Sequence, residues 1–259
     1  MHYRGLLLDI DGTLYQSGRP IPGAVNTVAR LRRNGVSLRF VTNTTSKSAA
    51  SIVEKLRRMG FEARTGEVHS PPVVAGAMLR EEAASAALFV PDNALDDFHG
   101  VPNDQEKPDY VVLGDLGFDW TFRRLNQAFE LAKEGARLMA LGRTRYWQTS
   151  HGLQLDVGPF GAALEYAKGQ QATTLGKPDP RVFLDAIKDM GLRPEEVAVV
   201  GDDVETDVRA AMRAGLKGIL VRTGKYRDGD EAGEPPPDLV IDSVAGLHVR
   251  RKPEGRART

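Results

Sequence analysis

The chain of 259 residues contains no cysteine. Disulfides, zinc–thiolate sites and cysteine nucleophiles are therefore excluded. Histidine is scarce, and its positions lack the spacing of a metal site, so none is predicted to be catalytic: His2, His69, His99, His151 and His248.

An excess of charge of either sign is also missing. Lys and Arg together number 35, as do Asp and Glu, so the formal net charge is zero. This balance does not favour nucleic acid or an acidic membrane surface as the main partner. No apolar run approaches the about 20 residues of a membrane span, and the first residues, MHYRGLLLDID, do not match a signal peptide. We therefore expect a cytoplasmic protein without membrane association.

Strand-like and helix-like segments alternate along the chain. Apolar runs predict strands at 6–8, 36–42, 87–91, 109–115, 136–142, 196–203 and 218–224, with a short one broken by prolines at 67–72. Helical spacing predicts helices at 22–33, 45–60, 121–135, 180–191 and 206–216. This alternation predicts an α/β fold with a doubly wound, Rossmann-like parallel sheet.

Polar side chains follow three of the predicted strands, where ligands bind in parallel sheets. The residues concerned are Asp9 and Asp11, Thr42 and Asn43, and Asp202 and Asp203. Strand alternation places positions 9 and 11 on the same side. We therefore expect these groups to converge.

Converging carboxylates need compensating positive charge, because burying them unpaired costs several kcal/mol. Lys177 supplies one charge, and Mg²⁺, which prefers carboxylate and carbonyl oxygens, would supply two more. Thr42 and nearby backbone N–H groups suit phosphate oxygens. Each motif alone has an ordinary interpretation as a turn, a helix cap or a loop. Their occurrence together, in order, predicts a phosphoryl-transfer site.

The same motifs resemble those of the haloacid dehalogenase superfamily of aspartate-nucleophile phosphatases. DIDGT at 9–13 resembles its first motif, and Thr42 after RFV its second. Lys177 resembles the third motif, and GDDVETD at 201–207 the fourth. The stretches VTNTT, LDVGPFGAALEYA, GKPDP and VRTGKYR are similar to the NagD-like branch, subfamily IIA. The resemblance covers nearly the whole chain.

The resemblance implies a role for each motif. Asp9 would be the nucleophile, Asp11 the general acid and base, and Lys177 the group that neutralises negative charge. Mg²⁺ would be held by Asp9, the backbone carbonyl of Asp11, and Asp202, with Asp203 and Asp207 behind them. The implied phosphate-binding positions are Asp9, Ile10, Asp11, Thr42, Asn43 and Lys177.

The resemblance also implies a discontinuous hydrolase core and an inserted α/β cap of type II. The core would comprise residues 1–71 and 171–259, and the cap residues 72–170. The cap would close over a small phosphorylated substrate, with Arg145, Tyr146 and Trp147 and the segment 155–160 as candidate contacts. Tyr146 and Trp147 also fit the interior of the cap or a homodimer interface, and 155–160 also fits structure near the hinge.

The motifs leave other functions to be considered. A dehalogenase is disfavoured because that branch lacks the acid supplied by Asp11, and a mutase because its lid follows the first motif. A phospho-acceptor signalling domain would be about half as long. A weakly catalytic phosphate-binding module is disfavoured by the intact motifs. The substrate is left open among phosphate esters, including sugar, nucleotide and pyridoxal phosphates, phosphoamides and pyrophosphate, as is promiscuity among them.

Overall fold

The computed structural model describes residues 3–149 and 152–248, so His2, His151 and the last eleven residues lie outside the described part. The chain forms two compact units. The first, here the core unit, comprises Met1–Thr42, Val53–His69 and Pro180–Thr259. The second, here the insert unit, comprises Asn43–Ile52 and Ser70–Asp179.

The core unit is built on a parallel six-stranded sheet. Its order is β14 (Leu239–Ile241), β13 (Lys217–Val221), β12 (Val197–Gly201), β1 (Gly5–Asp9), β4 (Ser37–Val41) and β5 (Val68–His69). Leu8 of β1 lies opposite Val200 of β12 and Phe40 of β4. All five residues of β1 and of β12 are buried, as expected for a parallel sheet covered on both faces. The predicted Rossmann-like core is confirmed.

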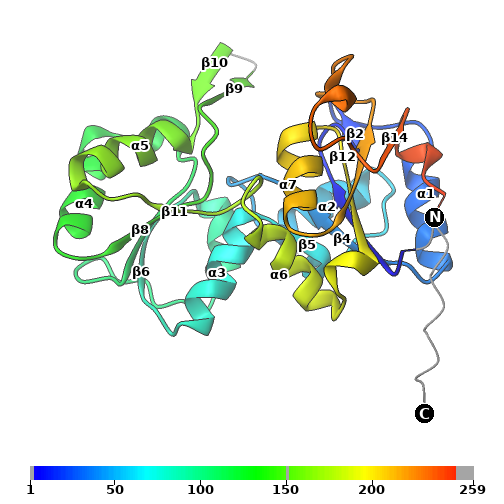
Figure 1. Cartoon of the computed structure of the whole chain (residues 1–259). Helices are drawn as coiled ribbons and strands as arrows, with labels where there is room; N and C mark the ends of the chain where they lie inside the picture. The colour runs from blue at the N-terminus through cyan, green and yellow to red at the C-terminus, as the bar shows by residue number, and fades with distance from the viewer. Residues whose placement is uncertain (1–2, 150–151, 249–259) are drawn as a thin grey trace. The chain divides into compact units, whose positions relative to one another are not determined.

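Helices and one hairpin complete the core unit. The helices are α1 (Ala24–Arg33), α2 (Ala49–Arg58), α6 (Arg181–Met190) and α7 (Ala210–Arg213), and the hairpin is β2 (Tyr15–Gln16) with β3 (Arg19–Pro20). The first residues of α2 belong to the insert unit. Helix α6 packs against β1, β4 and β5, and α7 against β13 (Figure 1). Predicted helices 22–33, 45–60 and 180–191 are thus present with shorter bounds.

The insert unit has a smaller parallel sheet of its own, which is the predicted α/β insert. Its strands, in order, are β11 (Thr173–Thr174), β8 (Arg137–Ala140), β7 (Tyr110–Leu113) and β6 (Ala86–Phe89). Its helices are α3 (Pro71–Glu81), α4 (Phe122–Lys133) and α5 (Val157–Lys168), and a hairpin joins β9 (Tyr146–Thr149) to β10 (Gly152–Leu155). Helices α4 and α5 pack together against β7 and β8 (Figure 1).

Short helical turns connect these elements. The 3-10 turns are η1 (Thr65–Glu67), η2 (Asp92–Phe98), η3 (Gly117–Asp119), η4 (Pro194–Glu196), η6 (Asp230–Ala232) and η7 (Val244–Gly246), and η5 (Val204–Arg209) is a π-helical turn. Among the described helices, none has the length and apolar character needed to cross a bilayer.

One predicted strand is shorter than expected, and the candidate segment 155–160 is partly helical. The predicted strand at 67–72 ends at His69, and Pro71 begins α3, because proline in the first turn of a helix forfeits no needed hydrogen bond. The segment 155–160 contains the start of α5, where the Asp156 side chain accepts a 2.7 Å hydrogen bond from the Val157 N–H group.

The limits of the two compact units differ from the predicted domain boundaries in two places. Residues 43–52, and residues 171–179 with strand β11, group with the insert unit. Strand β11 does so because it pairs with β8 of the smaller sheet. The predicted boundaries at 71/72 and 170/171 stay a prediction.

Candidate active site

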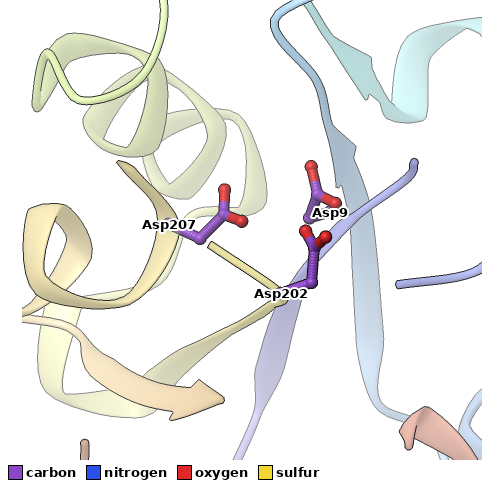
Figure 2. Close-up of side chains that lie close together, drawn as sticks. All are labelled: Asp9, Asp202 and Asp207. Carbon is purple, nitrogen blue, oxygen red and sulfur yellow. The ribbon is translucent and has the colours of Figure 1, made fainter. Parts of the chain in front are cut away.

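Three buried carboxylates meet at the carboxyl end of the core sheet. Asp9 is the last residue of β1, Asp202 directly follows the neighbouring strand β12, and Asp207 lies on η5. One carboxylate oxygen from each lies within 4.8 Å of the other two. Figure 2 shows the three side chains projecting into the same region. The parallel order of β1 and β12 therefore brings together acids that are about 190 positions apart in sequence.

The position of Asp202 is set by two glycines and one backbone N–H group. Gly12 and Gly224 both have positive φ, at 88° and 62°, and a Cβ atom on either would collide with the Asp202 carboxylate. The Lys225 N–H group donates a 2.6 Å hydrogen bond to Asp202 Oδ2. The loop after β13 therefore holds Asp202, a role that sequence reasoning missed. The available signal was the glycine within VRTGKYR, just beyond a buried strand.

Asp9 is oriented by the turn that follows β1. The buried Thr13 hydroxyl donates a 3.1 Å hydrogen bond to Asp9 Oδ2. The Thr223 hydroxyl donates to the Gly12 carbonyl at 2.5 Å and so ties this turn to the loop after β13. Thr13 and Thr223 were not predicted as site residues, although Thr13 stands within the first motif. The nucleophile candidate is thereby held in one orientation.

Asp11 lies outside the strand, contrary to the expectation from alternation. Strand β1 ends at Asp9, and Asp11 stands exposed in the turn that leads to the β2–β3 hairpin. The Tyr15 hydroxyl donates a 2.8 Å hydrogen bond to Asp11 Oδ2, and Lys55 Nζ donates to the Tyr15 oxygen at 2.6 Å. Burial, and then the charge and hydrogen bond of Asp11, raise the pKa of Tyr15, so the phenol stays protonated.

The two remaining acids of the fourth motif differ in what they contact. Asp207 joins Asp9 and Asp202, and its Oδ2 accepts a 3.2 Å hydrogen bond from the Asp203 N–H group. The Asp203 carboxylate instead accepts hydrogen bonds from the Glu205 and Thr206 N–H groups at 3.1 and 3.0 Å. Burial acts to raise the pKa of Asp203, but the hydrogen bond from Thr206 and the charge of Lys225 outweigh it and lower the pKa. Asp203 thus supports η5, on which Asp207 lies.

Thr42 directly follows strand β4, which lies beside β1 in the sheet. It is buried, and its N–H group donates a 3.1 Å hydrogen bond to the His69 carbonyl of β5. The ends of β12, β1 and β4, three neighbouring strands, therefore carry Asp202, Asp9 and Thr42. Asp9 and Asp202 lie close together, whereas the approach of the Thr42 side chain to them stays a prediction.

Asn43 and Lys177 are joined to each other within the insert unit. The Asn43 side chain accepts a 2.7 Å hydrogen bond from the Lys177 N–H group and donates one of 2.8 Å to the Lys177 carbonyl. Lys177 is only 8% exposed. Gly176 has a φ of 91°, and a Cβ atom at this position would lie 3.0 Å from the Asn43 side-chain oxygen. A larger residue would therefore disturb the Asn43–Lys177 pair. The predicted action of Lys177 on phosphate stays a prediction.

The three candidate specificity residues of the insert unit are exposed. Arg145 precedes β9, which contains Tyr146 and Trp147, 53% and 44% exposed. Their interpretation as buried interior of the insert is therefore wrong. Substrate contact and a homodimer interface stay as predictions.

The carboxylate group formed by Asp9, Asp202 and Asp207 fits a divalent cation. Its ligand atoms are all oxygens, which Mg²⁺ prefers, and the three residues are buried, where repulsion between carboxylates is strongest. The set contains no histidine, so its chemistry suits Mg²⁺ better than zinc.

Comparisons with known proteins agree with this geometry. A family model described as "Haloacid dehalogenase-like hydrolase" matches residues 6–100, and one described as "HAD-hyrolase-like" matches residues 174–247. Human haloacid dehalogenase-like hydrolase domain-containing protein 2 is 40% identical over 241 residues, which cover 93% of this chain and 92% of that protein. The chain belongs to the haloacid dehalogenase-like hydrolase family.

Further relatives place this haloacid dehalogenase-like hydrolase among phosphatases. Bovine phospholysine phosphohistidine inorganic pyrophosphate phosphatase is 40% identical over 249 residues, covering 93% of this chain and 92% of that protein. The crystal structure of 4-nitrophenylphosphatase from Thermotoga maritima matches with a TM-score of 0.86 and 29% identity, covering 94% of this chain and 95% of that one. The fold of NagD from E. coli K-12 matches with a TM-score of 0.88 at 24% identity, covering 96% and 99% of the two chains. The fold is that of the predicted NagD-like branch, and the homologues support phosphatase activity.

Proposed function

We propose that this haloacid dehalogenase-like hydrolase is a Mg²⁺-dependent phosphatase that cleaves a small phosphorylated metabolite through an aspartyl-phosphate on Asp9. The observation that carries the proposal is the buried carboxylate group at the adjoining ends of β1 and β12, of which Asp9 is a member. Phosphoryl transfer depends mainly on positioning and on charge stabilisation; Asp9 of this group would be the positioned nucleophile, and the group would hold the cation that supplies the positive charge.

In the first step, an Asp9 carboxylate oxygen attacks phosphorus. The bond from phosphorus to the leaving oxygen breaks, its electron pair stays on that oxygen, and the Asp11 carboxyl group gives it a proton. In the second step, the Asp11 carboxylate takes a proton from water as the water oxygen attacks phosphorus. The bond from phosphorus to Asp9 then breaks, which restores the Asp9 carboxylate and releases inorganic phosphate.

Asp9, Asp202 and the backbone carbonyl of Asp11 would hold Mg²⁺, with Asp207 close by. The bound ion would supply positive charge against the repulsion between Asp9 and the phosphoryl group. The hydrogen bond from Thr13 orients Asp9, and the hydrogen bond from the Lys225 N–H group orients Asp202. These two hydrogen bonds hold the side chains before substrate arrives, which lowers the reorganisation needed for the reaction.

The remaining motifs bind the phosphoryl group in this proposal. Thr42 and the backbone of Asn43 contact its oxygens, and Lys177 neutralises its negative charge. Arg145, Tyr146 and Trp147 contact the rest of the substrate or form a homodimer interface. The protein works in the cytoplasm in this proposal.

The relatives suggest several substrate classes, which have to be compared by experiment. These relatives include a phospholysine phosphohistidine inorganic pyrophosphate phosphatase and a 4-nitrophenylphosphatase. A phosphate ester, a phosphoamide and pyrophosphate are therefore the three classes to compare. A promiscuous ester phosphatase, acting on sugar, nucleotide and pyridoxal phosphates, is one form of the same proposal.

The test is phosphate release by the purified chain with Mg²⁺ on one member of each class. We expect turnover that is abolished by EDTA, restored by Mg²⁺ and lost in Asp9→Asn. Acid-quenched samples of the wild type should contain a phosphorylated peptide that includes Asp9, and those of Asp9→Asn should not. Absence of phosphate release from every compound would contradict the proposal. Phosphate binding without turnover would then indicate a binding module.

A further inference from the structure

Asp11, Tyr15 and Lys55 form a chain of hydrogen bonds inside the core unit. The Tyr15 hydroxyl donates to Asp11 Oδ2 at 2.8 Å and accepts from Lys55 Nζ at 2.6 Å. The Lys55 ammonium also lies 4.0 Å from the centre of the Tyr15 ring. The phenol oxygen therefore uses its hydrogen in one direction and a lone pair in the other.

Elements distant in sequence hold this chain in place. Tyr15 opens β2 and is only 4% exposed, so its ring is packed and its hydroxyl direction is restricted. Lys55 stands on α2, forty positions away. The Leu14 N–H group donates to the Ile10 carbonyl at 2.9 Å, which closes the turn that contains Asp11. Asp11 itself is exposed and would otherwise sample several rotamers.

The two oxygens of the Asp11 carboxylate differ in their contacts. Oδ2 accepts the Tyr15 hydrogen bond, while no hydrogen bond from within residues 3–149 and 152–248 reaches Oδ1. One oxygen is thus held by the protein, and the other is left for a proton transfer. A cation that donates to the phenol oxygen strengthens the hydrogen bond that the phenol gives in turn.

We infer that Tyr15 and Lys55 are positioning residues for Asp11, holding its carboxyl group so that Oδ1 faces the leaving oxygen of the substrate. This inference rests on the proposed phosphatase function and extends it to two residues outside the four motifs. Neither residue exchanges a proton with the substrate. Lys55 acts on Tyr15, and Tyr15 acts on Asp11.

The insert unit offers a matched control for these contacts. Tyr110 is 2% exposed, its hydroxyl donates a 2.8 Å hydrogen bond to Glu82 Oε2, and the Arg137 guanidinium lies 4.0 Å from its ring centre. Tyr110→Phe therefore removes a similar buried hydrogen bond at a place where no proton transfer is proposed. Arg137→Met is the corresponding control for Lys55→Met.

The experiment compares kcat/KM on two substrates that differ in their need for a proton. An alkyl phosphate must have its leaving oxygen protonated, whereas 4-nitrophenolate leaves as a stable anion. We expect Tyr15→Phe to lower kcat/KM about tenfold or more on the alkyl phosphate and less than about threefold on 4-nitrophenyl phosphate. Lys55→Met should show the same selectivity with a smaller loss, and Lys55→Arg should recover part of it. Tyr110→Phe and Arg137→Met should leave the ratio of the two values unchanged.

Equal losses on the two substrates would overturn the inference, since that result describes a structural defect and not a misplaced acid. Unchanged kcat/KM values on both substrates, in both Tyr15→Phe and Lys55→Met, would overturn it as well. Circular-dichroism melting curves show whether each variant is folded, and Lys55→Met carries the test if Tyr15→Phe unfolds. Wild-type protein that releases phosphate from neither ester would overturn the proposed function, and this inference with it.

Discussion

The core unit and the insert unit share one architecture but carry different residues at their strand ends. Both contain a parallel sheet covered by helices. In the core, acids at the ends of β1 and β12 converge, and within the described ranges the group with Asp9 is the one set of acidic or histidine side chains close enough to share a metal. The insert instead exposes large apolar side chains: Leu95, Phe118, Phe122, Tyr146, Trp147, Leu153, Leu155 and Tyr166. The same type of fold thus carries a carboxylate group in one unit and a set of exposed apolar side chains in the other.

A parallel sheet therefore does not have a function by virtue of its fold alone. Asp115 also follows a buried strand, β7, but no partner carboxylate of the described residues joins it in a group close enough for a metal. In the core, Asp202 stands beside Asp9 because Gly12 and Gly224 leave room for its carboxylate. Close backbone packing at a strand end, and not the strand itself, creates the proposed site.

The largest expected effect separates the strand-end acids of the two units. Asp202→Asn should lower kcat/KM by about 10²-fold or more, because it removes a charge from the carboxylate group. It should also raise the Mg²⁺ concentration needed for half-maximal activity. Asp115→Asn, the matched change in the insert, should alter both by less than about threefold. Steady-state kinetics over a Mg²⁺ series measures both, and equal losses would abolish the contrast between the units.

A smaller effect is expected from a methyl group placed beside Asp202. Gly224→Ala should lower apparent Mg²⁺ affinity about tenfold, because the new Cβ atom displaces the carboxylate. Gly229→Ala is the control: Gly229 also has positive φ, at 95°, but a Cβ atom there meets nothing within 4 Å. If the two variants lose the same affinity, strain in the left-handed backbone and not the collision is responsible.

The two tryptophans of the insert should respond in opposite ways. Trp147, which is exposed, should change the free energy of unfolding by less than about 0.5 kcal/mol when replaced by serine. The same variant should raise KM severalfold or weaken a dimer in analytical ultracentrifugation. Trp120 stacks between Phe89 and Phe160, and Trp120→Ala should cost about 2–3 kcal/mol in denaturant unfolding. A Trp147→Ser variant without effect on KM or assembly would refute recognition by this residue.

A further expected effect is a pH dependence of stability in the insert. Asp97 of η2 accepts hydrogen bonds of 3.1 Å from the Ala49 N–H group through both carboxylate oxygens. Burial, together with the charge of Asp96, raises its pKa to about 6. Between the unfolded pKa of about 3.9 and this value, the folded chain keeps a proton that the unfolded chain releases.

Stability should therefore fall as pH rises through that window and level off above it. The Asp97→Asn variant lacks this contribution. The difference in unfolding free energy between wild type and variant, measured in denaturant from pH 4 to 7, should change across the window and be constant above it. A difference that is the same at every pH would contradict the raised pKa.

Several elements were predictable because their signals are local. The leucine run before Asp9 and the valines before Asp202 indicate buried strands, and the spacing of apolar residues indicates α1, α4 and α6. Helix α3 is not predicted by the sequence, because two consecutive prolines are also typical of the end of a strand. Residues 206–216 do not form one regular helix, since η5 is a π-helical turn supported by Asp203.

The α/β class, the acids at the strand ends and the resemblance to aspartate-nucleophile phosphatases follow from residue types and their spacing along the chain. That Asp207 joins Asp9 and Asp202, while Asp203 supports η5, follows from contacts formed in the folded chain. The same is true of the contacts by which Tyr15 and Lys55 reach Asp11. Acids that are neighbours in sequence become distinct only when hydrogen bonds and close backbone packing between distant segments set the direction of each side chain.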